Sequence, residues 1–250
     1  MNTIPLIIAH RGFSDEAPEN SLAAFQRAVD ADADMLELDV RLSSDNIPVV
    51  FHDKHLQRTS GAKGSVQEKT AEQLTAVDNG SWFSPKFHRE RIPLLADILA
   101  AFKNETRFNI EIKPDIQSTD TLSAVEIVLQ EVKKAKVLAR VLFTSFNHSM
   151  IKELTELDNT ITTGVIYNPM THFRKSPSKL LSTAGAGIFV CSRYQLNSEV
   201  VNDTQHNGFK IFVYAVKTGR DIQRMLDLGV DGIICNNPKF VRETISLLMK

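Results

Sequence analysis

Cysteine is scarce in this chain, and the structures that depend on it are excluded. Among 250 residues there are two cysteines, Cys191 and Cys235, and neither belongs to a CxxC pair. Two separated cysteines cannot build a disulfide framework or a cysteine-based zinc site. Both lie in short apolar runs, so we expect them to be small buried core residues.

An excess of charge of one sign is also absent. Lys and Arg number 29 and Asp and Glu number 30, which gives a formal net charge of −1. This balance offers no electrostatic case for a nucleic-acid partner or for an anionic membrane surface. If the chain binds an anion, it must do so with a few placed cationic groups rather than with a broad positive field.

Long hydrophobic runs and targeting signals are missing as well. The longest continuous apolar run is Ile211 to Val216, far short of the roughly 20 residues that a membrane-spanning helix needs. No Lys or Arg precedes Arg11, and the apolar run from Leu6 to Ala9 is too short for the core of a signal peptide. We therefore expect no stable membrane association and a cytoplasmic location.

What the chain does contain is an alternation of strand-like and helix-like segments. Short runs rich in Val, Ile and Phe are separated by helical patterns, which indicates a parallel α/β sheet. The length suits a single (β/α)8 barrel, the TIM barrel. The expected strands are Leu6–His10, Met35–Val40, Val49–His52, Phe108–Lys113, Val141–Ser145, Thr162–Ile166, Ile188–Cys191, Ile211–Val216 and Gly232–Asn236.

Helix-start signals lie between these runs. Asn20 or Ser21 is placed to cap one helix, Thr70 begins a capping box, and Pro238 is a favoured first-turn residue. The apolar residues of Thr119–Val137 recur at helical spacing.

Nine expected strands are one too many for an eight-stranded barrel. The second and third are too close in sequence for a parallel crossover, which takes about a dozen residues or more. We expect a hairpin there, turning near Asp45 and Asn46. A two-residue turn would place Asp39 roughly opposite His52, with Glu37 one step along the same face.

Residues 54–91 differ from the rest in being polar and glycine-containing, with one short helix signal. We interpret them as a small cap inserted after the strand that ends at His52. On this interpretation residues 1–250 form a single domain, a TIM barrel with one insertion.

The expected strand ends are unusually polar, and active sites of parallel barrels collect at the carboxyl ends of the strands. Because alternate residues of a strand share a face, these side chains converge on one mouth if their faces point inward. The residues concerned are His10, Arg11, Glu37, Asp39, His52, Glu111 and Lys113.

Physical chemistry suggests a role for each group. Three close carboxylates repel one another, and all-oxygen ligands favour a hard divalent cation, Mg²⁺ or Ca²⁺. Arg11 and Lys113 are then available to bind an anion such as phosphate. Two histidines can share proton transfer as base and acid. A divalent cation, two cationic side chains that bind phosphate and a pair of histidines can together catalyse the cleavage of a phosphate diester.

At these residues the sequence resembles the glycerophosphodiester phosphodiesterase family. Order and spacing of the matching motifs agree over nearly the whole chain. The motifs are His10-Arg11-Gly12, Ala17-Pro18-Glu19-Asn20-Ser21, Leu36-Glu37-Leu38-Asp39-Val40, Val49-Val50-Phe51-His52-Asp53, Leu56-x-Arg58-Thr59, Asn79-Gly80-Ser81-Trp82-Phe83, Ile92-Pro93-x-Leu95, Ile110-Glu111-Ile112-Lys113, Ser145-Phe146 and Gly229-Val230-Asp231-Gly232-Ile233-Ile234.

The resemblance implies a TIM barrel that splits a glycerophosphodiester, a small soluble molecule, into sn-glycerol 3-phosphate and an alcohol. It also implies which residues do the work. The acid–base pair would be His10 and His52, the metal ligands Glu37, Asp39 and Glu111, and the phosphate contacts Arg11 and Lys113. Glu19 is interpreted as a residue that orients Arg11, with capping of a helix as the alternative.

Departures from the family pattern lie mainly near the C-terminus. Tyr214-Ala215-Val216-Lys217 stands where Trp-Thr-Val-Asn is usual, Asn236 where an Asp is common, and Leu94 where Thr is usual. None removes an expected metal ligand or proton-transfer group. Tyr214 keeps an aromatic wall for the substrate, and Lys217 adds a cation that would favour an acidic or phosphorylated head group.

Other functions and open points remain at this stage. Lys113 is a possible nucleophile of a Schiff-base aldolase, and a non-catalytic phosphate-ligand binder or a phosphodiesterase of phospholipase C or D type would use similar groups. The head group, the choice between Mg²⁺ and Ca²⁺, and the oligomeric state are left open. The remaining histidines are expected to be solvated surface residues; they are His55, His88, His148, His172 and His206.

Overall fold

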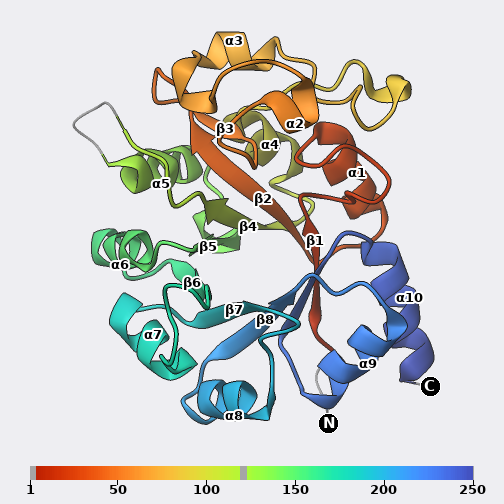
Figure 1. Cartoon of the computed structure of the whole chain (residues 1–250), viewed down its shortest axis with the longest axis vertical. Helices are drawn as coiled ribbons and strands as arrows, with labels where there is room; N and C mark the ends of the chain where they lie inside the picture. The colour runs from red at the N-terminus through yellow and green to blue at the C-terminus, as the bar shows by residue number, and fades with distance from the viewer. Residues whose placement is uncertain (1–3, 119–122, 250) are drawn as a thin grey trace.

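Eight parallel strands close into a barrel in the computed structural model, which describes residues 4–118 and 123–249 (Figure 1). The barrel order is β1-β9-β8-β7-β6-β5-β4-β2, and pairing of β1 with β2 closes the ring. A ninth strand, β3, pairs antiparallel with β2 alone. The strands are β1 (Leu6–His10), β2 (Met35–Leu42), β3 (Pro48–Val50), β4 (Arg107–Ile112), β5 (Val141–Ser145), β6 (Thr162–Ile166), β7 (Ile188–Ser192), β8 (Lys210–Tyr214) and β9 (Gly232–Cys235). The TIM-barrel prediction is confirmed.

Helices surround the ring of strands (Figure 1). The outer helices are α1 (Leu22–Asp30), α4 (Leu95–Phe102), α5 (Ala124–Lys134), α6 (His148–Leu157), α7 (Pro177–Ala184), α8 (Ser198–His206), α9 (Gly219–Asp227) and α10 (Pro238–Leu248). Two shorter helices, α2 (Gln57–Ser60) and α3 (Ala71–Thr75), follow β3, and single 3₁₀ turns lie at Val66–Glu68, Pro85–Phe87 and Leu138–Arg140. Within the described ranges no helix combines the length and the apolar character needed to cross a membrane.

The helix-start signals act where the sequence places them. The Ser21 hydroxyl accepts the Ala24 N–H at 3.1 Å and caps α1. Thr70 forms its capping box at α3, and Pro238 occupies the first turn of α10. The helix expected within Thr119–Val137 is found as α5. Residues 119–122 of the expected range lie outside the described residues.

The hairpin between β2 and β3 exists, but its register differs from the expectation by one residue. Val40 pairs with Val50, so Asp39 lies opposite Phe51, whose N–H donates to the Asp39 carbonyl at 2.9 Å. The turn takes one residue more than expected, because Asn46 adopts a left-handed conformation with φ 60°. A three-residue hairpin loop commonly ends in such a left-handed residue. His52 consequently follows the end of β3 instead of pairing within it.

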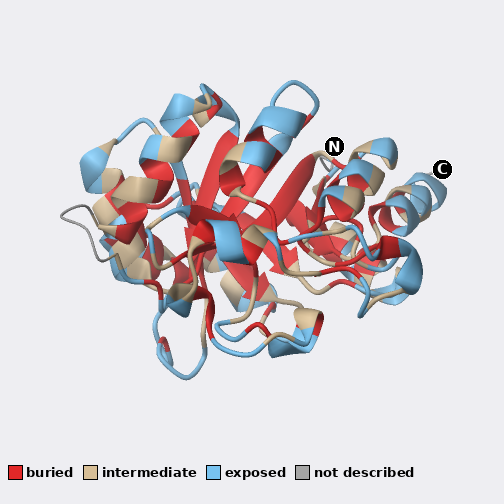
Figure 2. Ribbon diagram, turned by 90° about the horizontal axis from the view of Figure 1, so that it is seen from above, coloured by how far each residue is buried: buried red, intermediate tan, exposed pale blue. Residues whose placement is uncertain are grey.

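Apolar side chains fill both faces of the strand ring. One cluster lies inside the barrel and includes Ile8, Met35 and Phe212, while a larger one packs between the strands and the outer helices. Figure 2 shows the buried strands enclosed by helices whose outer faces are exposed. Both cysteines are buried in the larger cluster, as expected.

The segment after β3 packs on the hairpin through a small apolar core of its own. This core joins Phe51 at the end of the hairpin to Leu56, Val66 and Leu74 of the following segment. In Figure 1 the segment covers β3 at the top of the molecule, beside the mouth of the barrel. We refer to residues 54–91 as the cap.

Candidate active site

The acidic residues of the barrel mouth are brought together by strand register. Glu37 of β2 pairs with His10 of β1 on one side, and Asp39 pairs with Glu111 of β4 on the other. Parallel strands in register place such side chains next to each other at the same end of the barrel. Glu37, Asp39 and Glu111 each offer a carboxylate oxygen, and these oxygens lie within 4.8 Å of one another.

The turn after β1 explains why glycine follows His10-Arg11. Gly12 has φ +81°, and a Cβ there would lie 2.6 Å from the Ala24 backbone of helix α1. Arg11 is itself left-handed, with φ 55°, a conformation that costs a non-glycine residue about 1 kcal/mol or more. The strained turn aims the Arg11 N–H at Glu37, where it donates to Oε2 at 2.8 Å.

Two cations and one amide surround Asp39, whose side chain is 1% exposed. Lys113 Nζ lies 2.7 Å from Asp39 Oδ1 and 2.6 Å from Glu111 Oε1. Arg11 Nε lies 3.1 Å from Asp39 Oδ2. Asn20, which the sequence analysis did not select for the site, donates from Nδ2 to Asp39 Oδ2 at 2.8 Å. The Pro-Glu-Asn motif, which contains Asn20, was the sequence feature that could have identified it.

Charge in this cluster is unbalanced. Burial raises the pKa of Glu37 well above its ordinary value, and the Asp39 and Glu111 carboxylates raise it further. Burial would also raise the pKa of Asp39, but Lys113 and Arg11 outweigh it and lower that pKa. Three negatively charged carboxylates lie close to only two positively charged side chains, Arg11 and Lys113. The donor set, all oxygen and short of positive charge, fits a hard divalent cation.

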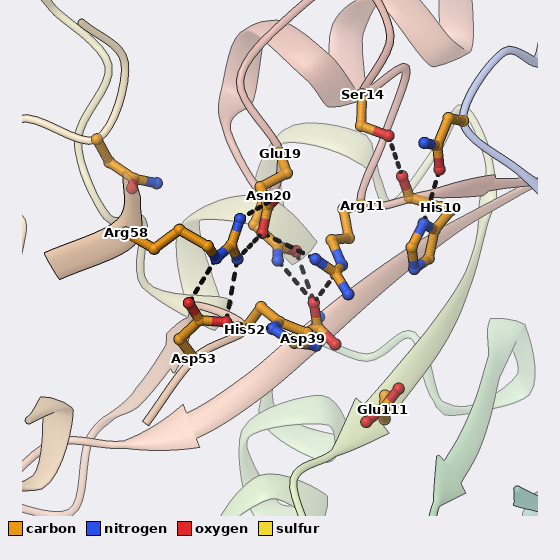
Figure 3. Close-up of polar contacts among 12 residues, drawn as sticks. His10, Arg11, Ser14, Glu19, Asn20, Asp39, His52, Asp53, Arg58 and Glu111 are labelled. Carbon is orange, nitrogen blue, oxygen red and sulfur yellow. Dashed lines mark hydrogen bonds and ion pairs between the residues drawn. The ribbon is translucent and has the colours of Figure 1, made fainter. Parts of the chain in front are cut away.

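The two histidines are anchored through Nδ1 to different partners. His10 Nδ1 lies 2.8 Å from Asn236 Oδ1, and His52 Nδ1 lies 2.5 Å from Asp53 Oδ1. Burial and then the Arg11 charge lower the pKa of His10 to about 4, so its ring is neutral at pH 7. Since an amide oxygen only accepts, His10 Nδ1 carries the proton and Nε2 remains as the basic nitrogen. Figure 3 shows both rings at the mouth.

A cavity of about 220 Å³ joins these groups. Its lining includes His10, Arg11, Glu37, His52, Glu111, Lys113 and Tyr214. Burial raises the pKa of Tyr214 to about 12, which keeps its hydroxyl protonated. Lys217 lines a separate cavity of about 290 Å³ with Asn236, so it does not face the group of residues that would hold a phosphate.

A wider cavity of about 700 Å³ adjoins the first and shares His52, Glu111, Lys113 and Phe146 with it. Cap residues and the loop after β4 form its other walls. Arg41, which sequence analysis missed, is buried at this boundary, donating to the His52 carbonyl at 2.9 Å and to Asp115 Oδ1 at 2.9 Å. Its position two residues after Asp39 puts it on the same face of the strand, but its contacts depend on how the end of the hairpin folds.

Glu19 lies beside Arg11, and its orienting role stays a prediction. Its Oε1 accepts from Arg11 NH1 at 2.9 Å. Arg58 of the cap binds both oxygens of the same carboxylate and also binds Asp53 (Figure 3). Asp53 and Arg58 belong to motifs noted in the sequence, but no role was derived for them there.

The expectation of solvated surface is wrong for two of the remaining histidines. His172 is 8% exposed, and its ring stacks on that of His148 with centroids 3.9 Å apart. Backbone groups hold both rings: Asn168 N–H donates to His172 Nδ1, and His148 Nε2 contacts the Ile166 carbonyl. The loop after β6 folds back over the barrel end, which the polar sequence of the loop does not reveal.

Comparisons with known proteins agree with this geometry. The sequence model of the Glycerophosphoryl diester phosphodiesterase family matches residues 10–240. A glycerophosphodiester phosphodiesterase of Caldanaerobacter subterraneus is 33% identical over 235 residues, covering 94% of this chain and 95% of that relative. One of Bacillus altitudinis is 32% identical over 241 residues, covering 93% and 94%.

A solved structure is similar throughout. The phosphodiesterase of Oleispira antarctica, in complex with its product sn-glycerol-3-phosphate, superimposes with a TM-score of 0.88 at 25% identity. The match covers 97% of each chain. The similarity therefore extends over the whole barrel rather than over one motif.

Proposed function

This chain belongs to the glycerophosphoryl diester phosphodiesterase family and is a phosphoric diester hydrolase, and we propose that it splits glycerophosphodiesters into sn-glycerol 3-phosphate and an alcohol. The observation that carries the proposal is that Glu37 and Glu111 line one cavity with two cations and two histidines. Asp39 lies close to both carboxylates and contacts both cations. The glycerol phosphate product bound to the Oleispira antarctica enzyme supports the same substrate class.

Glu37, Asp39 and Glu111 are the residues that would hold a divalent cation. Such a cation, Mg²⁺ or Ca²⁺, supplies electrostatic stabilisation for charge that develops on phosphoryl oxygens. Arg11 and Lys113 neutralise the remaining phosphate charge, and the guanidinium of Arg11 can bind two oxygens at once. The Arg11 side chain is 16% exposed, so these contacts form largely out of water, where they are stronger.

The proton transfers belong to His10 and His52. Each ring is held at Nδ1 by a side chain that does not line the inner cavity of about 220 Å³. This leaves Nε2 to exchange a proton with the substrate. One histidine removes the proton from the glycerol 2-hydroxyl as it attacks phosphorus, and the other protonates the oxygen of the departing alcohol. Water then opens the resulting cyclic phosphate to give sn-glycerol 3-phosphate. Tyr214 completes the wall on the β8 side.

The wider cavity next to His52 gives the alcohol group a place to extend. It shares His52 and Phe146 with the inner cavity and opens between the cap and the loop after β4. We propose that the glycerol phosphate part occupies the inner cavity and the alcohol part the wider one. The cytoplasmic location and the division into one barrel domain, residues 1–250, with residues 54–91 as an insertion stay predictions.

The aldolase alternative conflicts with the surroundings of Lys113. A Schiff-base lysine must be neutral to attack a carbonyl. Burial would lower the pKa of Lys113, but Asp39 and Glu111 outweigh burial and raise it. The ammonium form is therefore favoured, which suits an anion-binding role.

The proposal is tested by measuring release of glycerol 3-phosphate in a coupled assay. The substrates are the glycerophosphodiesters of choline, ethanolamine, glycerol and inositol, each with and without EDTA. We expect turnover of at least one diester, lost in EDTA and restored by Mg²⁺ or Ca²⁺. Tight binding of a diester without release of alcohol would instead support the non-catalytic binder. Turnover only of intact phospholipids would support the phospholipase alternative.

A further inference from the structure

Arg58 of the cap binds two carboxylates that belong to different parts of the barrel mouth. Its guanidinium lies 2.6 Å from Glu19 Oε1 and 2.9 Å from Oε2, and 2.6 Å from Asp53 Oδ2 and 3.0 Å from Oδ1. Both contacts use two nitrogens and two oxygens, the arrangement in which arginine binds carboxylate with the most defined geometry. Figure 3 shows the side chain bridging the two acids.

Each of these carboxylates in turn holds a residue of the proposed machinery. Glu19 Oε1 binds Arg11 NH1 at 2.9 Å, and Asp53 Oδ1 binds His52 Nδ1 at 2.5 Å. A continuous series of ion pairs therefore runs from His52 through Arg58 to Arg11. Lysine in place of Arg58 has a single nitrogen and cannot bind both acids in this way.

We propose that Arg58 is a positioning residue that fixes the phosphate-binding Arg11 and the proton-transferring His52 relative to each other. The proposal rests on the function proposed above, because it takes the roles of Arg11 and His52 from there. It also gives the cap a role in the reaction, since the cap supplies the residue that ties the loop after β1 to the end of the hairpin.

A stability role does not account for this arrangement. The Arg58 side chain is 44% exposed, and water weakens ion pairs at such sites, so their contribution to folding is modest. Placement of reacting groups is far more sensitive, since a shift of about 1 Å costs roughly 10²-fold in rate. Loss of Arg58 should therefore change turnover much more than it changes the melting temperature.

The test compares Arg58→Gln with a matched control, Arg91→Gln, in the full chain with divalent cation and whichever of the four diesters wild type hydrolyses fastest. Arg91 is an exposed cap arginine whose side chain donates to the His88 and Glu90 carbonyls. We expect kcat of Arg58→Gln to fall about 10- to 100-fold, with Arg91→Gln unchanged and both melting temperatures close to wild type. Arg58→Lys keeps the positive charge but not the two-nitrogen geometry of the guanidinium. We expect its kcat to lie between those of Arg58→Gln and wild type.

Chemical rescue separates positioning from folding. In Arg58→Ala, added guanidinium at millimolar concentration should restore part of kcat, because it can occupy the space between the two acids. Guanidinium should not stimulate wild type or Arg91→Gln. Absence of any rescue would overturn the positioning role.

Double variants test the coupling through each acid. If Glu19 and Asp53 act through Arg58, the losses in Glu19→Gln/Arg58→Gln and Asp53→Asn/Arg58→Gln are smaller than the products of the single losses. Multiplicative losses would contradict the proposal, as would a kcat of Arg58→Gln within twofold of wild type. A wild-type protein that releases no glycerol 3-phosphate would instead overturn the proposed function itself, so the two failures are distinguishable.

Discussion

At the scale of single residues, the two proposed proton-transfer groups differ in how they are held. Asn236, a neutral amide, contacts His10, whereas His52 contacts the carboxylate of Asp53. Burial would raise the pKa of Asp53, but its contacts with Arg58 and His52 outweigh burial and lower the pKa to about 2. His52 thus has an ionised partner through the neutral pH range, while His10 is kept uncharged.

This difference leads to a prediction for both histidines. His10→Ala and His52→Ala should each lower kcat by at least about 10²-fold, the contribution of a positioned acid or base. Both rings line the cavity at the barrel mouth, so the fold should survive, and circular dichroism of each variant checks this. His206→Ala, which removes an exposed ring on α8, is the control and should keep full activity. Near-normal turnover in either site variant would remove that histidine from the mechanism.

At the scale of elements, the sequence predicts strands and helices well because each carries a local signal. The nine apolar runs became nine strands, and Ser21, Thr70 and Pro238 begin helices where expected. The hairpin register was missed by one residue because the length of a turn depends on a single left-handed residue, Asn46. Asparagine tolerates this conformation, but its presence does not distinguish a two-residue loop from a three-residue loop.

The site residues at the ends of barrel strands were predictable from the sequence, and those that depend on the cap and the loops were not. Residues that end parallel strands, such as Glu37 and Glu111, could be grouped because register follows from the barrel itself. Arg41 and Arg58 could not, since their contacts depend on how the cap and the hairpin end fold over the mouth. The burial of His172 depends likewise on the path of one loop.

The stacked pair in that loop predicts a pH dependence of stability. Burial and then His148 lower the pKa of His172 to about 4, whereas a histidine of the unfolded chain titrates near 6.5. Between these values the unfolded state binds a proton that the folded state does not, so stability falls as pH decreases. The loss from this one group is at most about 1.4 kcal/mol per pH unit.

Urea denaturation at several pH values between 7 and 4 measures this slope. His172→Gln keeps an acceptor for the Asn168 N–H but cannot titrate, so its unfolding free energy should depend less steeply on pH than that of wild type. His88→Gln, at an exposed cap position, should keep the wild-type slope. Equal slopes in wild type and His172→Gln would show that the stacked ring takes up its proton as freely as an exposed one.

At the scale of the whole molecule, the carboxylate cluster links metal binding to folding. Glu37 and Asp39 of β2 lie close to Glu111 of β4, and all three are at the carboxyl end of the ring of strands. An unfolded chain holds these residues far apart, so a cation that binds all three favours the folded state by mass action. At a concentration about 100 times Kd this amounts to about 2.7 kcal/mol, or roughly 5–10 °C in melting temperature for a chain of this size.

Glu37→Gln separates the ligand role from the charge of the cluster. Because burial and the neighbouring carboxylates raise the pKa of Glu37, its ionised form opposes folding when no cation is bound, and glutamine relieves this while still accepting the Arg11 N–H. We expect the variant to melt above wild type in EDTA and to gain little from Mg²⁺ or Ca²⁺, whereas wild type gains several degrees. Thermal melts of both proteins with and without cation decide the matter. A rise on cation addition as large in Glu37→Gln as in wild type would exclude Glu37 as a ligand.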